Sequence, residues 1–123
     1  MTRINVVPVE ELCDKHLLAE YRELPRVFKL ARPCPDAPKE YTLGTGHVKF
    51  FYDKLQYLID RFYDIVIELE KRGFKPQYQE PYYTTINPAL HNGYTPTPEA
   101  LLLNRARIAE RISQFKRPIR IAS

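Results

Sequence analysis

This 123-residue chain carries a formal net charge of +4 and two cysteines, and no apolar run approaches the roughly 20 residues of a membrane span. Its length fits one domain over residues 1–123, with a core that needs no disulfide or metal, so Cys13 and Cys34 are expected to be free thiols. Because no signal peptide is recognisable, we expect a soluble, cytoplasmic protein. We also expect that it uses no cofactor.

The first predicted helix begins near Pro8 or Val9, because proline is favoured in a first helical turn and the acidic residues that follow complement the helix dipole. Apolar residues then recur near helical spacing as far as Leu24. Pro25 should kink or end this helix, since proline removes one backbone hydrogen bond. A stiff, proline-rich connector over residues 33–42 is expected to follow.

The second predicted helix is the clearest and runs from about Gly46 to Arg72, where a wide apolar stripe repeats at helical spacing. A helix of that length would span about 40 Å. Gly73 stands where a C-terminal cap is expected. Residues 74–96 are rich in proline and tyrosine and are predicted to form a long ordered loop.

A third helix is predicted from a Thr97 cap to about Phe115, because Pro98 and Glu99 suit a first helical turn. No segment alternates convincingly as a strand. The chain is therefore expected to be all-α, a compact single domain of three main helices with long loops. Residues 99–123 carry six basic and two acidic side chains, a balance that fits either a polyanion-binding tail or a solvated helix face.

Arg22, Glu23 and Arg26 form the most informative local cluster. On a helix the two arginines lie about 40° apart around the axis, with Glu23 about 60° beyond Arg26. Two guanidinium groups placed in this way can bind phosphates on either side of a nucleotide while one carboxylate points between them. Spacing alone favours the plainer alternative, an exposed helical turn with an ion pair between Arg26 and Glu23.

Thr2 offers a nucleophile if Met1 is removed, which a small second residue normally permits. The freed α-amine would titrate near pH ~7.7–8.0, against about 10.4 for a lysine side chain. Roughly a tenth of it would be neutral at pH 7 and suited to Schiff-base chemistry on a sugar carbon. The Met-Thr pair is common, so it gains meaning only from the residues around it.

Those residues form long motifs within residues 1–74. They read MTRIN (1–5), HLLAEYRELPRVF (16–28), LGTGHVKFFYDKL (43–55) and, more weakly, KRGF (71–74). In these motifs the chain resembles the pyrimidine-dimer DNA glycosylases of the phage endonuclease V type. The resemblance includes one shortened loop and fades after residue 74.

The resemblance implies a DNA repair glycosylase with AP lyase activity that acts on cis-syn pyrimidine dimers. It assigns catalysis to the Thr2 amine and the Glu23 carboxylate. The amine would attack C1′ of the 5′ nucleoside, and Glu23 would stabilise the developing oxocarbenium charge. β-Elimination from the Schiff base would then break the strand. A monomer with its N-terminal segment threaded between helices is expected, acting on UV-damaged double-stranded DNA without a metal.

The same resemblance implies that Arg3, Arg22 and Arg26 clamp phosphates of a kinked duplex from which a base is flipped. A dimer weakens stacking and pairing, so deforming that site costs less than deforming normal DNA. His16 is implied to border the site, and its alternative is packing on the domain side of the helix. For His47 we expect a structural role at the start of the second helix.

Two departures from the family pattern leave the lesion range open. The loop after Phe28 is shorter and proline-rich, and the C-terminal end lacks a Trp/Tyr-rich segment. Three functions therefore remain: a pyrimidine-dimer glycosylase with lyase activity, a related glycosylase for another damaged or modified base, and a non-catalytic DNA-binding module. Thr2 and Glu23 argue against the third, since phosphate binding needs neither.

Four tyrosines cluster in and near the predicted loop and could stack on bases or pack the loop: Tyr78, Tyr82, Tyr83 and Tyr94. Packing is the prediction that we favour.

Overall fold

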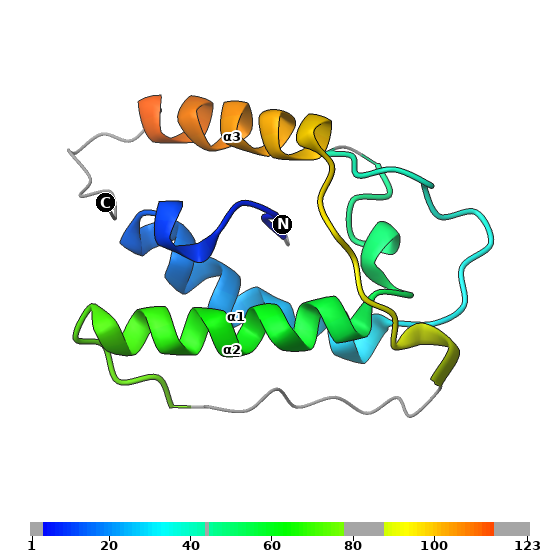
Figure 1. Cartoon of the computed structure of the whole chain (residues 1–123), viewed down its shortest axis with the longest axis horizontal. Helices are drawn as coiled ribbons and strands as arrows, with labels where there is room; N and C mark the ends of the chain where they lie inside the picture. The colour runs from blue at the N-terminus through cyan, green and yellow to red at the C-terminus, as the bar shows by residue number, and fades with distance from the viewer. Residues whose placement is uncertain (1–3, 44, 78–87, 115–123) are drawn as a thin grey trace.

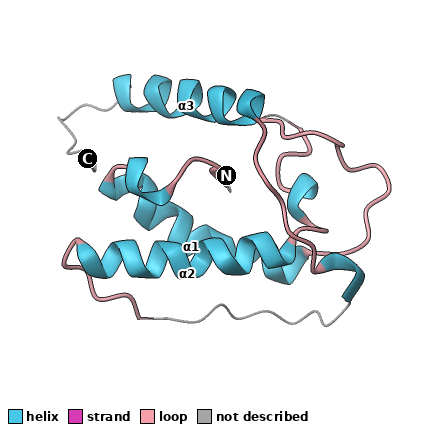
Figure 2. Cartoon of the chain, viewed as in Figure 1, coloured by secondary structure: helices cyan, strands magenta, loops and turns pink. Residues whose placement is uncertain are grey.

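The computed structural model describes residues 4–43, 45–77 and 88–114. Within them the chain forms three α-helices, three 3-10 turns and no β-strand, which confirms the all-α prediction (Figure 2). None of the described helices is long and apolar enough to cross a membrane. In chain order the elements are η1 (Val9–Glu11), α1 (Asp14–Leu30), η2 (Lys49–Phe51), α2 (Leu55–Lys71), η3 (Pro88–Leu90) and α3 (Pro98–Ser113).

The N-terminal segment, residues 4–8, runs between the helices. In Figure 1 it lies between α3 on one side and the pair formed by α1 and α2 on the other. Hydrogen bonds connect it to both sides, because Val6 bonds to Asn104 of α3 and Val7 bonds to Arg61 of α2. The predicted threading of this segment between helices is therefore confirmed.

The hydrophobic core lies between α1, α2, η2 and the N-terminal segment. Tyr21 of α1 stacks on Phe62 of α2 with ring centroids 5.6 Å apart. Each fully buried leucine or phenylalanine contributes about 1.5–3 kcal/mol by leaving water, so this core supplies most of the driving force for folding. Its largest fully buried apolar side chains are Ile4, Leu12, Leu17, Leu24, Phe28, Phe51, Leu55, Leu58, Phe62, Ile65 and Leu69.

The first helix differs from its prediction at both ends. The α-helix begins only at Asp14, after the 3-10 turn η1. Pro25 was predicted to kink or end the helix, but it lies inside α1, which continues to Leu30, so the helix does not end there. Val27 and Phe28, beyond the proline, are fully buried. Their burial offsets the backbone hydrogen bond that the proline removes.

The second helix begins at Leu55, not near Gly46. The continuous helix predicted from Gly46 is not formed because Lys54 has non-helical backbone angles (φ −123°, ψ 40°). The Lys54 ammonium donates to the Phe50 carbonyl at 2.9 Å and so occupies an acceptor that a continuous helix would have used. With 17 residues, α2 spans about 25 Å, shorter than predicted.

The predicted caps of α2 and α3 are present. Gly73 has a positive φ of 91°, and the Phe74 N–H donates to the Leu69 carbonyl at 3.0 Å, as in a Schellman motif. At the start of α3, the Thr97 hydroxyl accepts the Ala100 N–H at 3.1 Å. These local signals therefore predicted two helix ends correctly.

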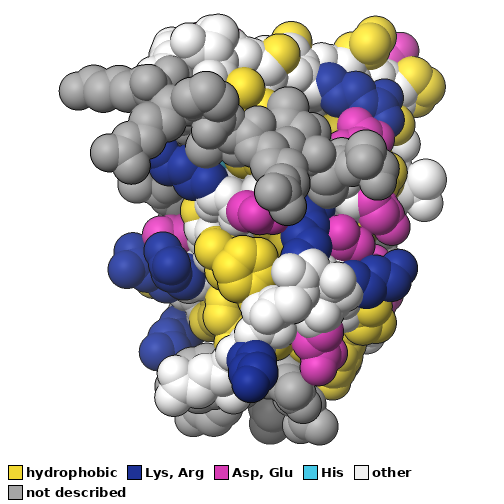
Figure 3. Space-filling view, turned by 90° about the vertical axis from the view of Figure 1, so that its left-hand side faces the viewer, with side chains coloured by type: hydrophobic (Ala, Val, Ile, Leu, Met, Phe, Trp, Pro, Cys, Tyr) yellow, Lys and Arg dark blue, Asp and Glu magenta, His cyan; other side chains and the backbone are white. Residues whose placement is uncertain are grey.

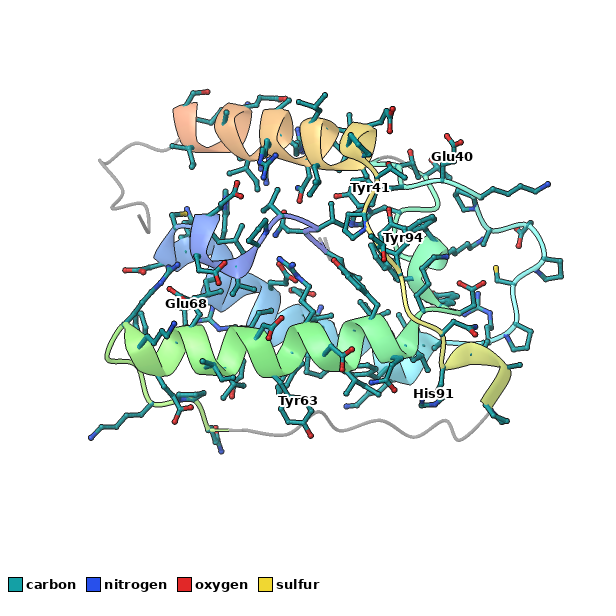
Figure 4. The ribbon with its side chains drawn as sticks, viewed as in Figure 1. Glu40, Tyr41, Tyr63, Glu68, His91 and Tyr94 are labelled. Atoms are coloured by element: carbon teal, nitrogen blue, oxygen red, sulfur yellow. The ribbon has the colours of Figure 1, made fainter. Side chains whose placement is uncertain are left out.

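Tyr94 packs in an aromatic cluster beside η2. Its ring centroid lies 5.3 Å from that of Phe50 and 5.3 Å from that of Tyr57, both in edge contacts. Figure 4 shows Tyr94 close to Tyr41 on this side of the molecule. Packing is thus the observed role of Tyr94. The other three tyrosines of that prediction lie outside the described residues. Both cysteines are free thiols, as expected.

Candidate active site

Polar side chains hold the N-terminal segment in place. His47 Nε2 accepts the Ile4 N–H at 2.9 Å, and the Tyr41 hydroxyl donates to the Ile4 carbonyl at 3.2 Å. Because Nε2 accepts, His47 is neutral and carries its proton on Nδ1, which faces the Thr42 carbonyl at 2.6 Å. Burial raises the pKa of Tyr41, so its hydroxyl stays a donor. His47 thus has a structural role, in the turn that precedes η2.

Two buried charges lie beside this segment. Glu20 of α1 and Arg61 of α2 are only 1% and 6% exposed and form a bidentate ion pair. Burial opposes the charge on Arg61, but the attraction of Glu20 prevails and raises the pKa of Arg61. Arg61 also donates to the Val7 carbonyl at 2.8 Å, and Glu20 accepts from the Asn5 amide at 2.8 Å. The pair therefore joins α1 and α2 to the N-terminal segment.

A cleft of about 390 Å³ opens next to the segment, between α1 and α3. Its wall includes Glu23 and His16 from α1, Arg107 and Arg111 from α3, and Ile4 from the N-terminal segment. Two guanidinium groups are thus combined with two carboxylates in a single concave site, Glu23 and also Glu20, which pairs with Arg61. Such a site suits an anionic ligand with a centre of developing positive charge.

The surroundings of His16 in the cleft disfavour its charged form. Burial, helped by the nearby charges of Arg111 and Lys15, lowers the pKa of His16 below its ordinary value. On the same helix, Arg26 lies 3.6 Å from Glu23 and its side chain is 71% exposed. This local ion pair is the contact that the plainer interpretation of the spacing predicted. It is a surface pair, and such pairs contribute at most about 1 kcal/mol to stability.

The structure brings only some of the predicted site residues together. Glu23 and His16 line the cleft. Arg22 and Arg26 are exposed on α1 and are not part of its wall. Thr2 and Arg3 lie outside the described residues. Within the three described stretches, no group of three or more His, Cys, Asp or Glu residues is arranged to hold a metal ion.

Sequence reasoning missed several residues of this region, among them the buried pair Glu20 and Arg61. Arg107 and Arg111 were included only in the general excess of positive charge near the C-terminus, although their spacing of four places them on one face of α3. The sequence also contained an indication of the buried ion pair between Glu20 and Arg61. Arg61 lies three residues after Leu58 and four before Ile65, on the apolar stripe of α2, where a charge needs a buried partner.

The N-terminal part of the chain is similar to a known protein family. A family model described as pyrimidine dimer DNA glycosylase matches residues 1–80. The match covers 80 of the 123 residues and includes α1 and α2, with Glu23 of the cleft. It ends before α3, which supplies the two arginines of the opposite wall.

Proposed function

The chain belongs to the pyrimidine dimer DNA glycosylase family, and from this premise we propose that it is a glycosylase and AP lyase whose nucleophile is the α-amine of Thr2. The observation that carries the proposal is that Ile4 and Glu23 line the same cleft. Two residues of chain reach at most about 7 Å, so the position of Ile4 supports a Thr2 amine that acts at this cleft. The mechanism requires removal of Met1.

In the proposed reaction, the neutral amine forms a bond to C1′ of the 5′ nucleoside while the bond from C1′ to the pyrimidine breaks. The base leaves with the electron pair and takes a proton. Glu23 stabilises the positive charge that develops on the sugar and assists proton transfer at the ring oxygen as the sugar opens to the imine. The imine then acidifies the C2′ proton, and its loss expels the 3′ phosphate, which breaks the strand.

Arginines on both helices support binding of the DNA backbone. Arg107 and Arg111 line the cleft, while Arg22 and Arg26 extend into solvent from the helix that carries Glu23. Guanidinium groups bind phosphate oxygens in a bidentate way, and each neutralised phosphate adds to the salt dependence of binding. We assign Arg22 and Arg26 to the DNA outside the cleft and the α3 arginines to the phosphates at the lesion, and we propose that Arg3 also binds DNA phosphate.

Borohydride trapping tests the proposal. Protein shown by mass spectrometry to begin at Thr2 is mixed with a duplex that carries one cis-syn thymine dimer, and separately with an abasic duplex. A reduced covalent complex with both duplexes is expected. Lys15 is another amine of the cleft wall, so K15R, which keeps the charge but removes that amine, must still be trapped. Protein with an acetylated N-terminus must not be.

The remaining outcomes separate the alternatives. Trapping on the abasic duplex alone would keep the Thr2 amine as nucleophile and indicate a related glycosylase for another damaged or modified base. Trapping on neither duplex, by protein whose N-terminus is free, would contradict the mechanism and leave a DNA-binding module. Loss of trapping in K15R would move the nucleophile to Lys15.

A further inference from the structure

Asn104 is the most deeply buried polar residue of α3, with 1% of its surface exposed. Its Oδ1 accepts the N–H groups of Val6 at 2.6 Å and Val7 at 3.2 Å. Its Nδ2 donates to Asn5 Oδ1 at 2.9 Å. All three hydrogen bonds therefore go to the N-terminal segment, nearly a hundred residues away in the sequence.

The Asn104 amide fixes the orientation of this segment as well as its position. Two consecutive peptide N–H groups point at one oxygen, so neither peptide plane can rotate without losing a buried hydrogen bond. Asn5 continues the network, because its Nδ2 donates to Glu20, the partner of Arg61. Arg61 in turn donates to the Val7 carbonyl, which closes a ring of polar contacts around the segment.

Asn104 also connects this segment to the basic wall of the cleft. Arg107 and Arg111 follow it on α3, one and two helical turns later, and all three residues line the cleft. Apart from Asn104, only Ala100 of this helix is buried. The Asn104 amide is thus the main buried link between α3 and the N-terminal segment, and it sets the distance between that segment and the two guanidinium groups.

The geometry points to Asn104 as a positioning residue for the Thr2 amine, an inference that rests on the proposed function. The amine would be the end of a short tether. His47 and Tyr41 hold Ile4, and Asn104 holds the three residues that follow it, Asn5 to Val7. Attack on C1′ requires the nitrogen to approach along one direction while the phosphates are held by α3. A misplacement of about 1 Å in such a geometry lowers the rate of a reaction by orders of magnitude without removing any reacting group.

The test compares Asn104→Ala with Arg105→Ala by single-turnover trapping on the abasic duplex. Arg105 is the next residue on α3 and pairs with Glu11 on the surface, away from the segment. For Asn104→Ala we expect trapping to slow by about tenfold or more while the dissociation constant of the duplex changes by less than about threefold. Arg105→Ala should trap at close to the wild-type rate.

Two further variants separate positioning from folding. Asn104→Asp keeps an acceptor for both N–H groups but loses the donor to Asn5 and buries a carboxylate, so it should recover only part of the rate. Asn104→Gln keeps the amide but displaces it by one methylene, so it should be slow even where its melting temperature matches that of the wild type. These two variants decide the question if Asn104→Ala does not fold.

The outcomes distinguish this inference from the function on which it rests. If wild-type protein forms no trapped complex, the proposed function fails and the positioning role fails with it. If the wild type is trapped and Asn104→Gln is trapped equally fast, only the positioning role is overturned. A parallel loss of rate and DNA affinity in Asn104→Gln and Arg105→Ala also overturns it, because that result indicates a general effect of loosening α3.

Discussion

The helices α2 and α3 are of similar length but are attached to the molecule in different ways. Along α2, apolar residues at helical spacing are fully buried, whereas α3 buries only Ala100 and Asn104. Leu102 of α3 is 67% exposed. Helix α2 is therefore held by the hydrophobic effect and α3 largely by hydrogen bonds. Helix α2 thus belongs to the packed scaffold, whereas α3 is a wall of the candidate active site whose position depends on a few directional contacts.

The charges follow the same division. The ion pair of α2 with α1, between Arg61 and Glu20, is buried, whereas Arg105 of α3 pairs with Glu11 at the surface. Figure 3 views the molecule from the left-hand end of Figure 1 and shows Lys and Arg side chains next to Asp and Glu side chains. That end is thus not a uniformly basic surface. In the cleft itself, Arg107 and Arg111 both come from α3.

Substitutions on the two walls of the cleft should affect different steps, cleavage for the α1 wall and DNA binding for the α3 wall. For Glu23→Gln on α1 we expect cleavage to fall by about 100-fold or more with duplex binding retained, because the carboxylate stabilises charge only in the transition state. For Arg111→Ala on α3 we expect weaker binding and a salt slope reduced by about one. Single-turnover cleavage and fluorescence anisotropy measure the two effects.

Glu40→Gln is the matched control, because it removes the same charge from an exposed position outside the cleft (Figure 4). It should change neither quantity appreciably. A fully active Glu23→Gln would contradict the mechanism, and an unchanged salt slope for Arg111→Ala would remove α3 from the DNA interface.

The buried ion pair Arg61–Glu20 should contribute far more to stability than the surface pair Arg105–Glu11. Arg61→Leu leaves Glu20 charged and buried without its partner, which should lower the free energy of unfolding by about 3–5 kcal/mol. Arg105→Ala should cost less than about 1 kcal/mol, because its pair is exposed to solvent. Urea denaturation at pH 7 gives both values. Recovery of most of the loss in a Glu20→Leu/Arg61→Leu double variant would show that the unpaired charge causes it.

Hydrophobic truncations sharpen the same contrast. Leu58→Ala removes a fully buried side chain of α2 and should lower the unfolding free energy by about 2–5 kcal/mol. Leu102→Ala removes an exposed side chain of α3 and should change it by no more than about 0.5 kcal/mol. Equal losses in urea denaturation would mean that α3 is packed as tightly as α2.

The same physical distinction explains what the sequence could predict. The Thr97 cap and the Gly73 cap are local, since their hydrogen bonds join residues a few positions apart, and both were predicted. The break at Lys54 was missed because its side chain competes for a backbone carbonyl, which an apolar stripe does not reveal. Asn104 was missed because its partners lie at the other end of the chain. The side of the cleft on α1 was thus predictable, whereas the side on α3 depends on long-range polar contacts.

The smallest expected effect concerns the protonation of His16 on the cleft wall. Burial, with Arg111 and Lys15 nearby, lowers the pKa of His16 in the folded state, so the unfolded chain binds the proton more readily. Its contribution to stability is complete above the unfolded pKa of about 6.5 and is lost as the pH falls through the lower, folded value. The drop in unfolding free energy between pH 7 and pH 5 should therefore be smaller in His16→Gln than in the wild type. A His91→Gln variant is the control, because His91 lies outside the cleft, beside η3 (Figure 4). If His16→Gln follows the wild-type pH dependence as closely as His91→Gln does, folding does not lower the pKa of His16, and neither burial nor the charge of Arg111 across the cleft disfavours its protonation.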